Sequence, residues 1–180
     1  MHPVVAALLA APLALALAAA PALAQSGPSA AQIIQSLKPT GAGLKDATRG
    51  IRPANAKAAT ESGPAVSLNV RFATGSAELT GQARDMLDQL GQALTSQDLA
   101  QFHFRIEGHT DTVGTAEANK ALSQRRADAV AAYLQQHFGI AADRLQSVGM
   151  GEEGLAVATP PQTANVQNRR VRVVNQDAAG

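Results

Sequence analysis

From residue 66 onward, apolar and polar residues follow each other in patterns that predict strands. Val66, Leu68, Val70 and Phe72 alternate with polar residues, which is the two-residue period of a half-buried strand. The segment 102–107 repeats that alternation. Two shorter segments predict a third and a fourth strand, at 144–148 and 169–174.

Two stretches between these strands carry apolar residues at helical spacing instead. Thr80 can cap a helix over 81–94, in which leucines recur every three or four residues. A longer helix is predicted from about 115 to 137. Gly139 followed by Ile140 is typical of a left-handed helix end with an apolar contact after it.

The alternation also bears on the architecture. Strands covered by helices on both faces are almost continuously apolar, whereas these strands each keep one polar face. We therefore expect an α+β fold, a two-layer sandwich with a mixed four-stranded sheet and its helices on one face, in the order β-α-β-α-β-(α)-β.

The first 24 residues differ from the rest. Residues 4–24 are uncharged and Ala-rich, and Ala22-Leu23-Ala24 has the small-x-small pattern of a signal-peptidase site. A secretory signal peptide over 1–24 is predicted, although no Lys or Arg precedes the apolar run. An uncleaved membrane anchor is the alternative, because the run is just long enough to span a bilayer.

Residues 25–65 are predicted to be a basic linker, rich in Pro, Gly and Ala and mostly disordered. Frequent Pro and Gly prevent long regular elements. Five basic residues stand against two acidic ones, and 30–37 has the pattern of about two helical turns. The folded domain is then predicted over 66–176.

Composition excludes several classes of protein. The formal net charge of +1 argues against a nucleic-acid binder, and 3% aromatic residues leave few stacking surfaces. The absence of Cys excludes a disulfide framework, a thiol nucleophile and a lipidated N-terminal cysteine.

Motifs of catalysis and cofactor binding find little support. Residues 149–154 match G-x-G-x-x-G, but Glu152 and Glu153 would repel a pyrophosphate and no helix follows. His103 and His109 lack a third metal ligand at a suitable spacing. The sequence therefore predicts no enzyme, no cofactor and no metal site.

One charged residue falls on the apolar side of the long helix. At about 100° per residue, Arg126 lies within the stripe of Ser123, Val130 and Leu134, whereas Arg125 lies toward the polar face. An inward arginine needs a partner or a polar pocket.

The loop 108–114 before this helix offers a partner in Asp111. Two interpretations stay open. The pair is a structural salt bridge, or it is a site for a zwitterion, with Arg126 taking a carboxylate and Asp111 an ammonium. The free N–H groups of the helix start favour a further negative group.

Five blocks of sequence, in order, resemble the OmpA-like C-terminal peptidoglycan-binding domain. They lie at 72–80 (FATGSAELT), 106–114 (IEGHTDTVG), 119–127, 149–152 and 168–171 (NRRV). The resemblance covers residues 66–175 and implies the one-face-covered sandwich described above. The sequence departs from the family at Ala118, where an aromatic residue is common. It also departs after the 149–152 block, where a proline that usually follows closely comes only at Pro160.

The resemblance implies non-covalent binding of peptidoglycan through the diaminopimelate of its stem peptide, which helps to tether the cell envelope. Asp111 is implied to meet the diaminopimelate amine and Arg126 its carboxylate. The supporting pocket residues that the resemblance implies are Thr110, Thr112, Gly114, Asn119, Leu122 and Arg169.

The expected location is the periplasm or outer membrane of a Gram-negative cell. The expected partners are peptidoglycan and other envelope proteins, and no nucleic acid. Association with the membrane is expected to be only peripheral or through an uncleaved N-terminus. The chain lacks the cysteine of a lipoprotein, the strands of a barrel fusion and the intramembrane Asp of a flagellar stator protein. Two alternatives remain: an envelope protein–protein interaction module and, with less support, a wall-remodelling hydrolase.

Overall fold

A computed structural model describes residues 27–39, 63–73 and 75–178. The predicted signal peptide and residues 40–62 of the predicted linker lie outside these ranges. The elements, in chain order, are α1 (Ala30–Leu37), β1 (Ala65–Leu68), α2 (Gly81–Leu94), β2 (Phe104–His109), α3 (Ala116–Phe138), the 3-10 turn η2 (Ala142–Arg144), β3 (Leu145–Gly151) and β4 (Val171–Asn175).

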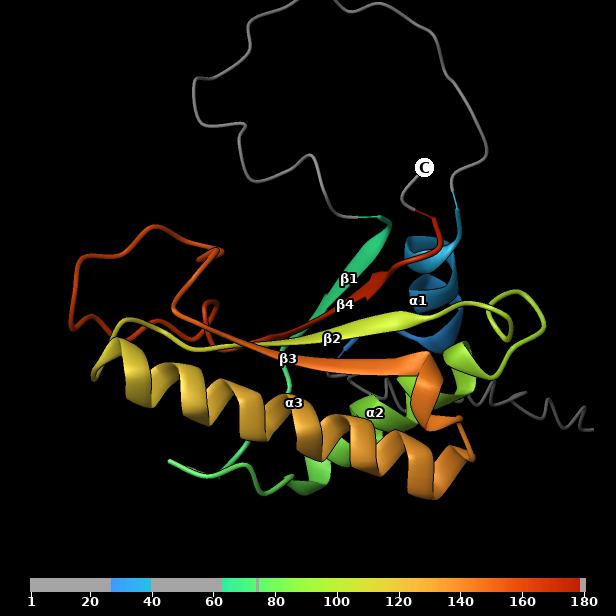
Figure 1. Cartoon of the computed structure of the whole chain (residues 1–180), viewed down its shortest axis with the longest axis horizontal. Helices are drawn as coiled ribbons and strands as arrows, with labels where there is room; N and C mark the ends of the chain where they lie inside the picture. Colours follow the sequence, from blue (N-terminus) through green and yellow to red (C-terminus); the bar gives the residue numbers. More distant parts are fainter. Residues whose placement is uncertain (1–26, 40–62, 74, 179–180) are drawn as a thin grey trace, which may run out of the picture.

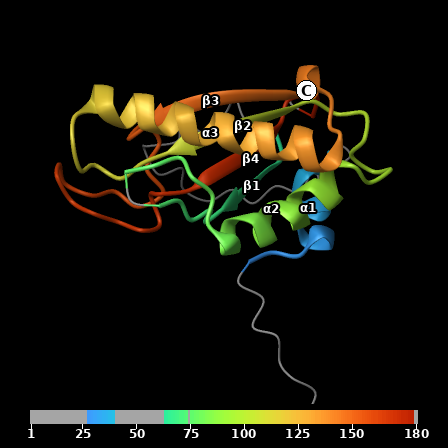
Figure 2. The same ribbon diagram turned by 90° about the horizontal axis from the view of Figure 1, so that it is seen from below.

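The four strands form one mixed sheet in the order β1-β4-β2-β3. Strands β2 and β3 run parallel, and β4 is antiparallel to both β1 and β2. The helices α2 and α3 lie below the sheet in Figure 1, and Figure 2 shows both from below with α1 beside α2. The predicted two-layer α+β sandwich is confirmed.

The helix boundaries agree closely with the sequence pattern, because side chains cap them. The Thr80 hydroxyl accepts from Ala83 N at the start of α2, and the Thr115 hydroxyl accepts from Ala118 N at the start of α3. Gly139 ends α3 in the left-handed conformation, at φ 62°.

The strand boundaries shift by a few residues. β1 ends at Leu68, because the chain leaves the sheet there and makes only an isolated bridge between Phe72 and Leu79. β2 begins two residues later than predicted, and β3 continues to Gly151. Apolar side chains alternate into one core between sheet and helices, where the largest fully buried ones include Phe104, Ile106, Leu68, Leu87, Leu90, Leu134 and Val171.

The short helix α1 belongs to this core, which corrects the predicted domain start at residue 66. Ile33 and Leu37 are fully buried, and the Asn175 side-chain amide donates to the Leu37 carbonyl oxygen at 2.9 Å. A complete capping box at Ser29 and Gln32 starts the helix. Residues 30–37 are therefore part of the folded domain rather than of a disordered linker.

Candidate functional site

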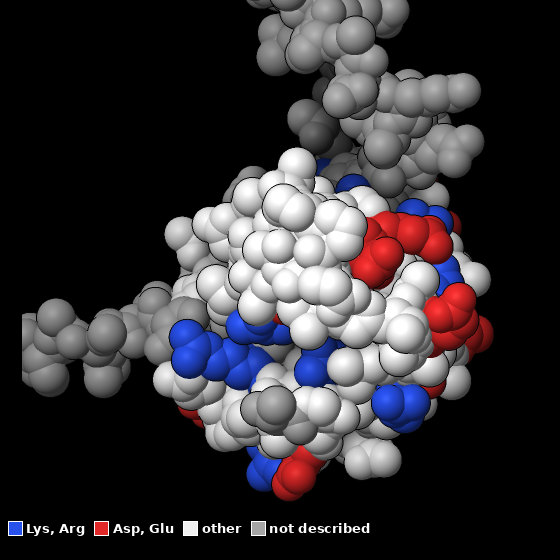
Figure 3. All heavy atoms as spheres, turned by 90° about the vertical axis from the view of Figure 1, so that its left-hand side faces the viewer, with Lys and Arg blue, Asp and Glu red and all other residues white. Residues whose placement is uncertain are grey.

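A pocket of about 250 Å³ opens at the end of the sheet where β1 and β2 finish and β4 begins. Figure 3 shows Lys and Arg side chains around a hollow on this end of the molecule. The pocket is lined by Asn69, Val70, Arg71, Phe72, His109, Arg126, Val166, Arg169 and Arg170.

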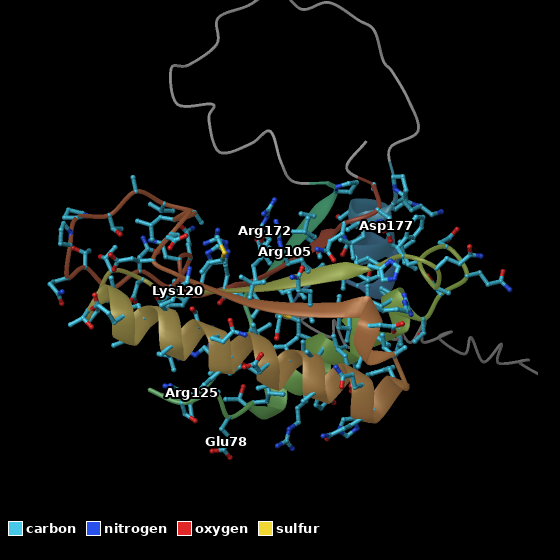
Figure 4. The ribbon with its side chains drawn as sticks, viewed as in Figure 1. Glu78, Arg105, Lys120, Arg125, Arg172 and Asp177 are labelled. Carbon is cyan, nitrogen blue, oxygen red and sulfur yellow. The ribbon has the colours of Figure 1, made fainter. Side chains whose placement is uncertain are left out.

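Arg126 is held rigidly in this pocket by the segment after β1. Only 8% of the residue is exposed, its Nε donates to the Ser76 carbonyl oxygen at 3.0 Å, and its guanidinium carbon lies 4.9 Å from the centre of the Phe72 ring. Burial, together with the nearby positive charge of Arg169, lowers the pKa of Arg126 below its usual range. Arg125 is exposed and lies on the side of α3 away from the sheet (Figure 4), so the predicted orientations of both arginines are confirmed.

Asp111 makes its ion pair with Arg169, which corrects the prediction that Arg126 is its partner. Arg169 Nη1 lies 2.5 Å from Asp111 Oδ2, and the backbone N–H of Asn165 donates to the same oxygen at 3.3 Å. The physical reason is that Ser76 and Phe72 hold Arg126 on the other side, while the segment leading into β4 brings Arg169 over the loop. Arg126 still feels the Asp111 charge, which acts to raise its pKa.

The other predicted pocket residues support the Asp111 loop and do not line the cavity. Thr112 Oγ1 donates to the Pro160 carbonyl oxygen at 2.7 Å and accepts from Thr163 N at 3.1 Å. Gly114, at φ +102°, exchanges two hydrogen bonds with the Gln162 side chain. The loop between β3 and β4 thus clasps the loop between β2 and α3.

Three further predicted residues have different surroundings. The Asn119 amide donates to the Asp111 carbonyl oxygen at 3.3 Å and to Glu152 at 3.4 Å, which fixes the loop to the first turn of α3. Thr110 is buried, and its hydroxyl has no hydrogen-bond partner in the described part of the chain. Leu122 is half-buried and lies outside the pocket lining.

Two glycines let α3 approach the sheet closely enough to reach this pocket. A Cβ on Gly108 would lie 2.2 Å from the Ser123 carbonyl oxygen, and one on Gly149 would lie 2.5 Å from Gln124 N. Any side chain at these positions would push α3 outward. The glycines of β2 and β3 therefore set the distance between α3 and the sheet, and with it the position of the inward polar residues of α3.

A second charged cluster, which we call the Glu107 cluster, consists of Arg105, Glu107 and Arg172 on the sheet face opposite α2 and α3 (Figure 4). Glu107 is only 3% exposed, although it lies on the polar face of its strand. Arg105 Nη2 lies 2.8 Å from one carboxylate oxygen and Arg172 Nη1 lies 2.9 Å from the other. Burial alone would raise the pKa of Glu107, but neighbouring His109, Arg172 and Arg105 lower it to about 2.

His109 lies between the Glu107 cluster and the pocket. It lines the pocket, its Nδ1 lies 3.0 Å from the Glu153 carbonyl oxygen, and its Nε2 is 3.8 Å from Glu107 Oε2, beyond hydrogen-bond distance. His103, on the same strand face, is exposed and pairs with Asp177 at 2.9 Å. The two histidines therefore have different environments, although the strand alternation predicts the same face for both.

The pocket contains residues to which sequence reasoning gave no role. Arg71, Phe72, His109, Val166 and Arg170 line it but were not predicted as site residues. A usable signal existed for Arg71 and His109, because both lie on polar strand faces near a predicted strand end. The second arginine of NRRV, Arg170, carried the same signal, since it lies on the polar face near the start of the predicted strand 169–174.

The match to a family model decides what kind of domain carries this pocket. The model described as "OmpA family" matches residues 71–169, more than half of the chain. This chain belongs to the OmpA family. The matched range contains α2, β2, α3 and β3, the loop between β2 and α3, and the loop after β3 up to residue 169. The elements α1, β1 and β4 lie outside it.

The names of similar curated proteins refer to peptidoglycan and the outer membrane. A "Peptidoglycan-associated lipoprotein" of Haemophilus influenzae is 40% identical over 101 residues, which cover 56% of this chain and 64% of that protein. An "Outer-membrane lipoprotein YfiB" of Pseudomonas aeruginosa is 30% identical over 109 residues, covering 61% and 63%. The chain thus spans just under two thirds of the length of these relatives.

Solved structures agree with the family assignment. The peptidoglycan-associated lipoprotein of Burkholderia pseudomallei has 34% sequence identity and a TM-score of 0.51, over 61% of this chain and 89% of that one. A cell wall anchor of a Pseudomonas aeruginosa secretion system, at 24% identity and a TM-score of 0.51 over 62% and 79%, shares the OmpA-like fold. Within the described ranges, no helix is both long and apolar enough to cross a membrane.

Proposed function

We propose that this chain binds peptidoglycan non-covalently through the diaminopimelate of the stem peptide, and that it catalyses no reaction. The observation that carries the proposal is a buried arginine, Arg126, presented in a pocket beside the carboxylate of Asp111. Relatives named for their association with peptidoglycan support the ligand class. On this proposal the chain works in the periplasm or at the outer membrane and helps to tether the envelope.

The carboxylate of the ligand binds to Arg126. Its Nε is committed to the Ser76 carbonyl, while its two Nη groups have no acceptor among the described residues. Their N–H groups form a planar fork that matches a carboxylate. Because Ser76 and Phe72 already fix the guanidinium, little side-chain entropy is lost when the ligand binds.

The ammonium of the ligand binds to Asp111 by replacing Arg169. In the free protein the Arg169 guanidinium is ion-paired with the Asp111 carboxylate. The Arg169 side chain is 43% exposed, so it can move away from Asp111 when the ligand arrives. The N–H groups of Asn165 and Val113 continue to orient the carboxylate when it does. The released Arg169 then lies beside the ligand carboxylate, so one exchange of partners gives both charges of the ligand a partner in the protein.

Sedimentation with purified sacculi tests this proposal with three variants. Asp111→Asn and Arg126→Ala should each weaken binding about ten- to a hundredfold, since a charge-assisted hydrogen bond contributes roughly 1.5–3 kcal/mol. Arg125→Ala removes the neighbouring exposed arginine and should bind as the wild type does.

Circular dichroism and melting curves must accompany these assays, because Asp111→Asn removes the partner of Arg169 and Arg126→Ala leaves the Ser76 carbonyl oxygen without its donor. Well-folded Asp111→Asn and Arg126→Ala proteins that still sediment like the wild type would contradict the diaminopimelate assignment. The muropeptides released during the same incubation report on hydrolysis, and release above the protein-free level would contradict the absence of catalysis.

A further inference from the structure

The pocket holds more positive charge than one zwitterionic ligand head neutralises. Four of its nine lining residues are arginines, and none is acidic. A ligand that carries one ammonium and one carboxylate is neutral overall. The cations of the lining would then stay unbalanced in a concave, partly desolvated place, which is unfavourable unless further anions arrive.

The partners of these arginines divide the pocket into two sides. On the α3 side, Arg126 donates to the Ser76 carbonyl and Arg169 pairs with Asp111. Arg170 lies two residues before Arg172 and so points to the sheet face opposite α3, and Arg71 is the remaining arginine of the lining. Arg170 Nη2 donates to the Gly154 carbonyl oxygen at 2.8 Å, but its Nη1 is buried without a hydrogen-bond partner in the described part of the chain. Arg71 is exposed, and its side chain makes no ion pair with the described residues.

Nearby carboxylates do not supply the missing acceptor. Glu107 is already shared by Arg105 and Arg172, although its charge reaches Arg170. Burial and the positive charge of Arg172 lower the pKa of Arg170. His109, which lines the same side, also has a buried Nε2 without a hydrogen-bond partner in the described part of the chain. Arg71 and Arg170 thus bring donor groups to one part of the cavity, beside His109, whose Nδ1 faces the Glu153 carbonyl oxygen and whose Nε2 faces Glu107.

We propose that the Arg71–Arg170 side of the pocket binds a second carboxylate of the same wall peptide, the free α-carboxylate of the γ-linked glutamate that precedes diaminopimelate. The proposal rests on the proposed function and deepens it, since it makes the protein selective for stem peptides that are not amidated at glutamate. A carboxylate offers only acceptors to these donors. A carboxamide at the same place would turn its own N–H groups toward the guanidinium groups and leave a donor facing donors.

Two synthetic muropeptides test this selectivity directly. They are identical in sugar and diaminopimelate and differ only at glutamate, which carries a free carboxylate in one and a carboxamide in the other. Isothermal titration of the full chain with each should give an affinity about tenfold higher for the acid, as expected for one charge-assisted contact. In Arg71→Gln and Arg170→Gln the two peptides should bind with nearly equal affinity, whereas Arg125→Gln should keep the preference.

The outcomes separate this proposal from the one on which it rests. If the wild type binds both peptides tightly and equally, the second carboxylate site is refuted and wall binding stands. If a folded Arg71→Gln protein keeps the full preference for the acid, the carboxylate binds elsewhere and the proposal is wrong. If neither peptide binds, diaminopimelate recognition fails and this inference fails with it. Arg71 is exposed, so its variant remains informative even if Arg170→Gln does not fold.

Discussion

The Glu107 cluster and the pocket are neighbouring groups of arginines that use their charges in opposite ways. In the Glu107 cluster, one buried carboxylate receives Arg105 at one oxygen and Arg172 at the other. In the pocket, four arginines surround a cavity whose lining has no carboxylate, and Asp111 reaches only Arg169. His109 lies beside both groups.

On the proposed function, charge serves stability in one place and binding in the other. A buried carboxylate that is fully satisfied inside the chain contributes to folding and has nothing left to offer a ligand. Arginines whose donors lack internal acceptors weaken the fold slightly and gain their acceptors from outside. Variants of the two groups should therefore separate loss of stability from loss of binding.

The largest expected effect on stability comes from Glu107→Gln. The change leaves two arginines facing an amide, and removing one partner of a buried pair costs about 3–5 kcal/mol, somewhat less here because Arg105 and Arg172 are partly exposed. Thermal unfolding should show a clear loss, with sacculus binding retained below the new midpoint. The exposed Glu78→Gln is the matched control and should unfold like the wild type. Equal midpoints for the two variants would contradict the structural role of the cluster.

The pH dependence of this loss gives a second, smaller effect. The pKa of Glu107 falls from an ordinary 4.5 to about 2 on folding, so its contribution is present above pH 4.5 and is lost as the pH falls toward 2. The stability difference between wild type and Glu107→Gln should thus shrink over that interval. Urea unfolding of both proteins at several pH values measures it. A difference that stays constant from pH 6 to pH 2.5 would show that Glu107 does not act through its charge.

The smallest expected effect on stability is that of Arg169→Gln. Its side chain is 43% exposed, so solvent screens its ion pair with Asp111, and such pairs contribute about 1 kcal/mol or less. The melting temperature should fall by far less than in Glu107→Gln, as differential scanning calorimetry would measure. A loss as large as that of Glu107→Gln would mean that the pocket is built for stability, and the contrast between the two groups would disappear.

The fold and part of the site could be predicted because they rest on local periodicity. Alternation along the strands and the position of Arg126 on its helix depend only on residue spacing, and both predictions are confirmed. The partner of Asp111 was predicted wrongly, because it depends on the path of the loop between β3 and β4. The burial of Glu107 was missed for a related reason, since a polar residue on a strand does not reveal what covers it.

The position of α1 shows the same limit. Ile33 and Leu37 form a short apolar pair within a segment rich in Pro and Gly, and the sequence does not say which surface they cover. Their burial comes from packing against α2 and β1, which only the assembled fold brings next to α1.

The bond between Asn175 and the Leu37 carbonyl also has a mechanical meaning. It ties α1 to the last residue of β4. The pocket lies at the opposite end of the sheet, where β4 begins. A pull between a ligand in the pocket and the N-terminal helix therefore runs along the strands. The ladder bonds between β4 and its neighbours β1 and β2 then share the load in shear, instead of opening one after another as in a zipper. In shear several ladder bonds must break together, and the unfolding rate rather than the equilibrium stability sets the resistance to force.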